Sequence, residues 1–384
     1  MIPTTPQGYT GALVTVDSAT GKVRAMVGGP GFDKFKFDIA TQALRQPGSS
    51  FKVFTLLALL EGGYGPNDFV DGSGPCQVKF PHVLPYKPIG NFEGEAPGVV
   101  SVTDATAFSI NCAFERLAVT VGLDKVVAMA QRLGIKTPLR AYPSTVIGSG
   151  EVHPIDMAGA YATLADDGIY HRPTLVERVL DRDGKLIEKG GDDGHRVLSA
   201  QVSRVAVRTL RAVVQYGTGA NAGLGNRPVA GKTGTSENYG NAWFDGFTSQ
   251  LTTVVWMGAP SGNVPIIVKG VRVVGGNYPA KIWGAFMADA LAGQPIIDFP
   301  QPNFNEMPAS LYIKGTPGNT GFAPPIGGPG ASTTTSVASP SPTTNSMPPT
   351  STPPTTSPPT TSPPTTSPPT TSPPTTSPPT TRPH

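Results

Sequence analysis

Strand patterns lie near both ends of the first 300 residues, with helical patterns between them, and this order constrains the fold more than any other feature. Residues 12–17 and 22–27 alternate in polarity around a short SATG segment, which predicts a β-hairpin. Segments rich in β-branched and aromatic residues predict later strands at residues 227–235, 241–249 and 251–258. Because these late strands suit antiparallel pairing, we expect the hairpin to join them in one sheet with helices packed on its faces.

Helical periodicity fills the middle of the chain and returns near its end. Apolar side chains recur at helical spacing in five segments, and glycine follows several of them as a stop signal. The predicted helices span residues 105–117, 126–133, 154–170, 202–219 and 280–291.

The composition changes towards the carboxyl end. The apolar pattern fades after about Asn303, and from Ala331 onward proline, threonine and serine dominate and end in tandem SPPTT copies. Such a segment has little apolar surface to bury, so it cannot offset the entropy lost on ordering. We therefore expect a domain over residues 1–300, a linker over 301–330 and a disordered, polyproline-rich tail over 331–384.

The charge of the chain argues against nucleic acid as a partner. The formal net charge is +3 over 384 residues, and no dense stripe of basic and aromatic residues is present. The sequence shows no signal peptide and no apolar run long enough to span a membrane, so the chain as given is expected to be soluble. Its abrupt start at Met1-Ile2-Pro3-Thr4 resembles the edge of an excised domain.

Cys76 and Cys112 are the only cysteines. They permit one disulfide, and composition does not decide whether it forms. A stalk rich in serine, threonine and proline is commoner outside the cytoplasm, where a bridge would persist. Two buried free thiols are the alternative.

The segment RQPGSSFK, residues 45–52, contains the first candidates for chemistry. After its Pro-Gly turn the chain is apolar on almost every face up to a Gly-Gly pair, which predicts a short buried helix. Ser49 and Lys52 would lie in the first turn of this helix with their side chains on one face. Burial lowers the pKa of a lysine, and a neutral lysine can act as the base for a serine nucleophile. The alternative is that Ser49 only caps the helix.

A second motif, Ser-x-Asn, has three candidate positions. Ser109 and Asn111 lie in a predicted helix between the other two motifs. The copy at residues 236–238 directly follows the third motif, and the copy at 261–263 lies in a turn beyond the last strong strand. We therefore select Ser109 and Asn111 on order and context.

The third motif is Lys232-Thr233-Gly234, extended by Thr235, at the end of a predicted strand. Its ammonium, hydroxyls and backbone N–H groups suit a terminal carboxylate and an extended peptide laid along the strand. Gly234 is expected to leave room for that peptide. In this order, Ser-x-x-Lys, Ser-x-Asn and Lys-Thr-Gly match the signature of serine β-lactamases and penicillin-binding proteins.

These residue types fit the needs of acyl transfer. Ser49 would attack a carbonyl, Lys52 would take its proton, and Ser109 would relay the proton to the leaving amine. Asn111 would bond the peptide group of the substrate. No metal and no cofactor is expected.

The chain resembles the transpeptidase domain of bifunctional (class A) penicillin-binding proteins over roughly residues 9–293. The likeness rests on RQPGSSFK, SINCAF, GTGANA and GKTGTSENYGNAWFDGFT, with GALVTVDSATGKVRAMVGG at the start and GGNYPAKIWGAFM near the end. It implies an α+β fold of the serine β-lactamase and D,D-peptidase type, an antiparallel five-stranded sheet flanked by helices. It also implies an oxyanion hole formed by the backbone N–H groups of Ser49 and Thr235. Ile110 stands where class A β-lactamases have aspartate, which favours the transpeptidase.

The resemblance implies a reaction and a location. A D-Ala-D-Ala stem peptide of peptidoglycan would acylate Ser49, an amine of a second stem peptide would take the acyl group, and β-lactam antibiotics would block Ser49. Full-length relatives carry a membrane anchor and a glycosyltransferase domain upstream, so the expected location is the extracytoplasmic face of the membrane, in the periplasm or cell wall. Two alternatives stay open: a D,D-carboxypeptidase or β-lactamase, in which water deacylates Ser49, and a non-catalytic module that senses β-lactams or binds the wall.

Overall fold

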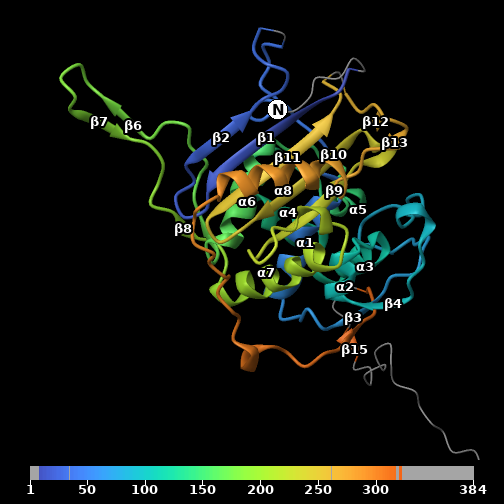
Figure 1. Cartoon of the computed structure of the whole chain (residues 1–384). Helices are drawn as coiled ribbons and strands as arrows, with labels where there is room; N and C mark the ends of the chain where they lie inside the picture. The colour runs from blue at the N-terminus through green and yellow to red at the C-terminus, as the bar shows by residue number, and fades with distance from the viewer. Residues whose placement is uncertain (1–7, 34, 261, 317–319, 322–384) are drawn as a thin grey trace, which may run out of the picture. The chain divides into compact units, whose positions relative to one another are not determined.

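A five-stranded antiparallel sheet forms the centre of the fold in the computed structural model (Figure 1). The strand order is β2-β1-β11-β10-β9, so the amino-terminal hairpin joins the late strands as predicted. β1 pairs with β11 along its whole length, from Thr10 opposite Gly258 to Asp17 opposite Leu251. The strands are β1 (Thr10–Asp17), β2 (Val23–Val27), β9 (Ala230–Thr235), β10 (Asn241–Phe247) and β11 (Leu251–Gly258).

The structure describes residues 8–33, 35–260, 262–316 and 320–321. These belong to one unit of the chain that ends at Gly327. The predicted tail, residues 331–384, lies outside the described residues. Within the described ranges, no helix is both long and apolar enough to cross a membrane.

Alternation along the strands gives the sheet two apolar faces. Val14 and Val254 lie opposite each other and belong to the larger core, which contains helices α1, α6 and α7. Leu13 and Val255, one position along each strand, belong to a second core with Trp283 of α8. Since neighbouring side chains of a strand point to opposite faces, helices must cover both sides of this sheet. α8 crosses in front of the sheet in Figure 1.

Eight α-helices surround the sheet within the described residues. They are α1 (Lys52–Glu61), α2 (Val102–Ala107), α3 (Asn111–Val121), α4 (Leu123–Arg132), α5 (Pro143–Val146), α6 (Pro154–Ala165), α7 (Ala200–Gln215) and α8 (Tyr278–Ala290). Short 3-10 turns are η1 (Gly48–Phe51), η2 (Phe92–Gly94), η3 (Ala220–Ala222), η4 (Glu237–Tyr239) and η5 (Phe304–Glu306).

Two predicted helices differ from the sequence-based expectation near the site. The first turn of the buried helix is the 3-10 turn η1, and α1 begins only at Lys52. The single helix expected over residues 105–117 is two helices, α2 and α3, because Ser109 between them has a φ of 62°. A right-handed helix cannot continue through that left-handed backbone conformation. Ser109 is therefore a turn residue and not a helical one.

Smaller sheets lie outside the central one. β3 (Phe69–Asp71) pairs with β4 (Val99–Ser101) and with β14 (Tyr312–Ile313), which lies inside the predicted linker; the domain boundaries stay a prediction. The strands β6 (Arg178–Leu180) and β7 (Leu186–Lys189) form a hairpin that stands away from the central sheet in Figure 1. The other short strands are β5 (Ile169–Tyr170), β8 (His195–Arg196), β12 (Ile267–Val268), β13 (Val271–Arg272) and β15 (Thr320–Gly321).

Candidate active site

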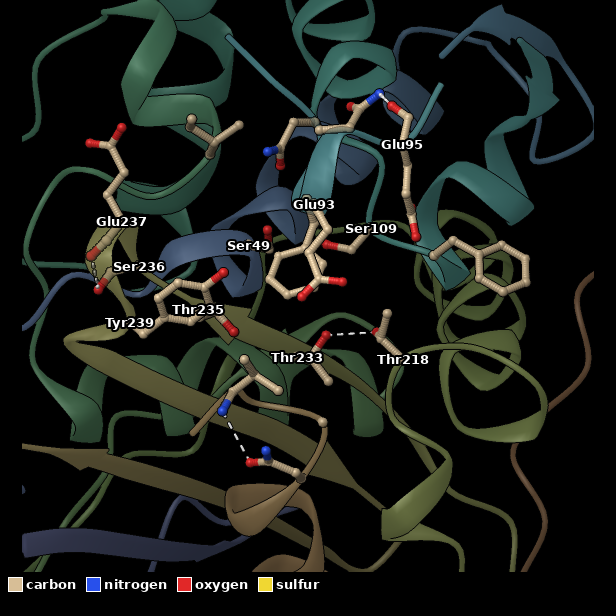
Figure 2. Close-up of a pocket in the computed structure, with 18 of the residues that line it drawn as sticks. Ser49, Glu93, Glu95, Ser109, Thr218, Thr233, Thr235, Ser236, Glu237 and Tyr239 are labelled. Carbon is tan, nitrogen blue, oxygen red and sulfur yellow. Dashed lines mark hydrogen bonds between the residues drawn. The ribbon is translucent and has the colours of Figure 1, made fainter. Parts of the chain in front are cut away.

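A cleft of about 590 Å³ opens along β9, the edge strand of the sheet (Figure 2). Its walls come from η1, the turn before α3, β9, η4 and the loop around η2. The predicted site residues that line it are Ser49, Ser109, Asn111, Thr233 and Thr235. Lys52 and Lys232 are fully buried and both contact Ser109. The structure thus brings all three motifs together.

Ser49 lies in η1 and faces the cleft (Figure 2). Within the described residues, no side chain caps η1 or α1, whose N-cap positions are Pro47 and Phe51. The capping alternative for Ser49 is therefore wrong. Its neighbour Ser50 is fully buried and donates to the carbonyl of Pro47 at 2.9 Å, so Ser50 has a structural bond and Ser49 faces the cavity.

Lys52 has the environment that a lysine base requires. Its side chain is fully buried, and burial, reinforced by the charge of nearby Lys232, holds its pKa well below the usual range. Lys52 Nζ lies 2.6 Å from the carbonyl oxygen of Ser109 and 2.6 Å from Asn111 Oδ1. Both oxygens only accept, so they use the two hydrogens of a neutral amine. The nitrogen lone pair is left to accept a proton.

Ser109 connects the two lysines. Its turn conformation directs the hydroxyl to Lys232 Nζ at 2.8 Å and to Lys52 Nζ at 3.3 Å. Lys232 Nζ also donates to the carbonyl of Thr233 at 3.2 Å. Burial lowers the pKa of Lys232 to about 7, and the nearby carboxyl of Asp245 opposes this shift. A hydroxyl between two lysines of lowered pKa can pass a proton along a short path.

The edge strand β9 presents hydroxyls to the cleft. Thr233 Oγ1 lies 2.7 Å from Thr218 Oγ1, and Thr235 Oγ1 accepts from the backbone N–H of Gly275 at 3.1 Å. The structure adds a second reason for glycine at position 234. A Cβ there would collide with the carbonyl oxygen of Pro47, so glycine is needed for β9 to pack on η1; the expected room for substrate stays a prediction.

Both the oxygen and the nitrogen of the Asn111 side-chain amide form hydrogen bonds. Its Nδ2 donates to the carbonyl of Gly90 at 2.8 Å, and Lys52 donates to its Oδ1. One Nδ2 hydrogen remains for a ligand, because a side-chain amide carries two. The loop that carries Gly90 is fixed by a disulfide between Cys76 and Cys112, which decides the question that composition left open.

The other two Ser-x-Asn copies lie at other positions relative to the two lysines. Ser236 lines the cleft, and its hydroxyl accepts from the backbone N–H of Asn241 at 3.0 Å. Asn238 has a φ of 59° in η4 and also lines the cleft. Asn263 bonds to Ser236 and Asn241, while Ser261 lies outside the described residues. Among the described residues, no hydrogen bond joins these copies to either lysine.

Several functional residues were not predicted from the sequence. Thr218 precedes GANA in a segment that the sequence marks only by resemblance, yet its hydroxyl meets Thr233. Phe92 and Tyr239 face each other across the cleft with ring centroids 6.2 Å apart. Glu115 and Asp245 are buried carboxyls behind Lys52 and Lys232. Thr218, Tyr239 and Asp245 lie in segments that carry the family resemblance, but their proximity to the other site residues depends on tertiary packing and gave no separate signal.

A second cavity of about 1010 Å³ adjoins the first. Both cavities are lined by Asn111, Ile147, Ser236 and Glu237. The wall of the second cavity includes residues 82–90 of the disulfide-tied loop. The two cavities therefore share a wall at Asn111.

The fold and the site are those of a serine-type acyltransferase, with a fully buried lysine in the site. The family description "Penicillin binding protein transpeptidase domain" matches residues 11–261. The chain therefore belongs to the penicillin-binding protein transpeptidase domain family. The predicted family and fold class are confirmed.

Known relatives and solved structures agree with this assignment. The chain is 33% identical over 315 residues to penicillin-binding protein 1A of Mycolicibacterium smegmatis, which covers 76% of this chain and 39% of that protein. It is 33% identical over 302 residues to penicillin-binding protein 1A of Aquifex aeolicus, covering 77% of this chain and 40% of that protein. The structure of PonA1 from Mycobacterium tuberculosis in complex with penicillin V superimposes with a TM-score of 0.71 at 31% identity, over 83% of this chain and 85% of that chain. The chain spans about two fifths of the length of the curated relatives it matches.

Proposed function

We propose that this domain is a peptidoglycan D,D-transpeptidase that cross-links stem peptides through an acyl-serine intermediate on Ser49. The observation that carries the proposal is the environment of Lys52. A fully buried lysine with lowered pKa, whose two amine hydrogens are directed to Ser109 and Asn111, is ready to take the proton of a neighbouring serine. Family membership supports the same reaction class.

Acylation would start from a donor peptide ending in D-Ala-D-Ala. Ser49 Oγ forms a bond to the carbonyl carbon between the two alanines, and the bond from that carbon to the terminal D-alanine nitrogen breaks. The proton of Ser49 passes to Lys52 and through Ser109 to the leaving amine. The backbone N–H groups of Ser49 and Thr235 would hold the oxyanion. Gly48 supports this pairing, because it packs against the backbone of Thr235 with a φ of 54°.

The donor's terminal carboxylate would bind at the hydroxyl pair of Thr218 and Thr233, close to Lys232. Hydroxyls and an ammonium are strong donors to a carboxylate. The rest of the donor would extend along β9, whose outer edge faces the cleft and offers unpaired backbone groups to a peptide strand. β-Lactams carry a carboxylate and a reactive amide, so they would bind at the same position and acylate Ser49.

Transfer to a second stem peptide requires room for an acceptor beside the acyl-enzyme. The second cavity supports a transpeptidase over a carboxypeptidase, since it adjoins the first at Asn111. The relatives named penicillin-binding protein 1A are longer than this chain. We propose that the domain belongs to a membrane-anchored protein with a glycosyltransferase domain and acts at the extracytoplasmic face of the membrane.

Two measurements test the proposal. Mass spectrometry after incubation with penicillin V should find one adduct, on the peptide that contains Ser49. Incubation with a D-Ala-D-Ala donor and an amine-bearing acceptor stem peptide should then yield a cross-linked dimer. Release of D-alanine without dimer would make the domain a carboxypeptidase, rapid penicillin hydrolysis would make it a β-lactamase, and an adduct without any turnover would make it a sensor.

A further inference from the structure

Asp245 is a buried carboxyl without a hydrogen bond. It lies on β10 with no exposed surface, and neither of its oxygens has a partner among the residues that the structure describes. The hydroxyl of Ser50 is close enough to favour the carboxylate, but it donates to the carbonyl of Pro47 at 2.9 Å. Burying a carboxyl in this way is costly unless another group compensates, so its surroundings decide its role.

The group opposite Asp245 is the site lysine. In the register of β9 and β10, Asp245 pairs directly with Lys232, and directly opposed residues carry their side chains on the same face of a sheet. Lys232 donates to Ser109 in the cleft. Asp245 therefore lies behind the ammonium that we assign to the donor carboxylate.

Other titratable groups surround the pair from three helices. Lys52 comes from α1, and Glu115 of α3 acts on Lys52. Tyr161 of α6 lies near Asp245, but its hydroxyl donates to the carbonyl of Ser50 at 2.8 Å. Asp245 is thus the carboxyl that acts on Lys232.

We propose that Asp245 is a positioning residue for Lys232: the two opposed side chains together carry one proton, and Asp245 keeps Lys232 able to become an ammonium when a donor carboxylate binds at Thr218 and Thr233. This inference rests on the proposed function, because it concerns the same carboxylate. The step moves a proton only. Either the lysine is neutral and the carboxyl is protonated, or the lysine is an ammonium and the carboxyl is ionised.

The two arrangements are close in free energy. Burial lowers the pKa of Lys232 to about 7 and raises the pKa of Asp245 to about 8, so near neutral pH the pair titrates as a unit. An anion that enters the cleft beside Lys232 favours the ammonium. An ammonium can only donate to Ser109, whereas a neutral amine can also accept from it. The pair therefore also sets the direction of the Ser109 hydroxyl in the proton relay.

The test compares two acylating agents on Asp245→Asn. Penicillin V carries the free carboxylate, and its methyl ester does not. Without the carboxyl of Asp245, Lys232 loses its proton at lower pH, so the alkaline fall of the penicillin V acylation rate should move to lower pH. At pH 8, above the Lys232 pKa of about 7, each unit by which that pKa falls lowers the protonated population about tenfold, so we expect a loss of up to about tenfold. The rate with the ester should change little, so selectivity for the acid over the ester falls.

A matched control is Asp68→Asn. Asp68 is equally buried, but it accepts from the backbone N–H groups of Gly65 and Leu311, away from the lysines. Its loss should lower the melting temperature and leave the ratio of acid to ester rates unchanged. Equal losses with acid and ester in Asp245→Asn, or an unchanged pH profile, overturn the proposal. If the wild-type protein reacts with neither agent, the proposed function fails instead.

A second measurement leaves Asp245 intact, in case Asp245→Asn does not fold. Ser49→Ala binds penicillin V without acylation, and infrared difference spectra of protein labelled with 13C-aspartate report whether a buried aspartic acid loses its proton on binding. At pH 7 Asp245, with its pKa raised to about 8, is protonated, so binding of the carboxylate should move its proton to Lys232 and remove one protonated-carboxyl band. In Lys232→Met the band should persist on binding. A band that persists in Ser49→Ala overturns the proposal.

Discussion

Lys232 donates to the hydroxyl of Ser109 over 2.8 Å, although 123 positions separate the two residues in the sequence. The same hydroxyl lies 3.3 Å from Lys52. One turn residue therefore joins a helix lysine and a strand lysine in a single hydrogen-bonded chain. Removing its hydroxyl breaks that chain without removing either amine.

Ser109→Ala should lower the acylation rate with penicillin V by roughly 10² to 10⁴, the usual range for a lost acid-base group. Asn111→Ala should also lower the acylation rate, because it removes the amide oxygen that accepts a hydrogen bond from Lys52. Asn263→Ala is the control: its side chain bonds to Ser236 and Asn241, away from the lysines, and little change is expected. Second-order rates for the three variants decide the matter. A large loss at Asn263 with Ser109 silent would overturn the site.

Ser49→Ala should abolish labelling by a fluorescent penicillin while the melting temperature stays near that of the wild type, because no capping bond is lost. Ser50→Ala gives the matched comparison. It removes the buried bond to Pro47 and should cost about 1 kcal/mol of stability while labelling persists. Labelling of Ser49→Ala at the wild-type rate would contradict the assignment.

The sequence motifs indicated which side chains lie together, but not the turns that bring them together. Ser49, Lys52 and Lys232 were identified by motif, and the sheet by the order of strand and helix patterns. The left-handed backbone of Ser109 was not foreseen, because a helical pattern of apolar residues runs across it. The close approach of Gly234 to Pro47 was not foreseen either, because only the folded chain brings these two residues together.

The buried carboxyls could not have been predicted from a single sequence. Asp245 occurs at an ordinary strand position, and Glu115 occurs one turn along the helix from Asn111. Each carboxyl affects the site only because tertiary packing brings it near a lysine from another part of the chain. Periodicity identifies a buried position, but not the charge that packs against it.

Lys52→Arg should lose acylation although the positive charge is kept, because arginine does not deprotonate in proteins. Lys52→Met should also be inactive but should melt at a higher temperature than the wild type at pH 7. The folded-state pKa of Lys52 lies well below its unfolded value, so between the two values the unfolded state binds more protons than the folded state, and stability rises with pH. Thermal melts at pH 7 and pH 10 check this: the gain from methionine should shrink at the higher pH. An acylation rate of Lys52→Arg near that of the wild type would show that Lys52 has a structural role and does not act as the base.

The disulfide should support both stability and the site. It links residues 36 positions apart, for which chain entropy gives a stabilisation of roughly 4 kcal/mol. Cys76 also exchanges backbone hydrogen bonds with Ile89, next to the Gly90 carbonyl that holds Asn111. The double variant Cys76→Ser with Cys112→Ser should therefore melt at a lower temperature and acylate several-fold more slowly at 20 °C, where it is still folded. Reduction of the wild type should reproduce both effects. A lower melting temperature with an unchanged acylation rate would show that the disulfide stabilises the fold but does not support the site.

Glu115→Gln should make stability less dependent on pH. Burial raises the pKa of Glu115 to about 8, above the 4.5 of an exposed glutamate. Between these values the folded state holds a proton that the unfolded state has released, so this group's contribution to stability falls as pH rises from about 4.5 to about 8. The variant should therefore have a higher melting temperature than the wild type at pH 8 and nearly the same melting temperature at pH 5.

Glu188→Gln, on the exposed strand β7, is the control, and its melting temperature should match that of the wild type at both pH values. Parallel melting curves for Glu115→Gln and the wild type from pH 5 to pH 8 would show that Glu115 is ionised in the folded protein.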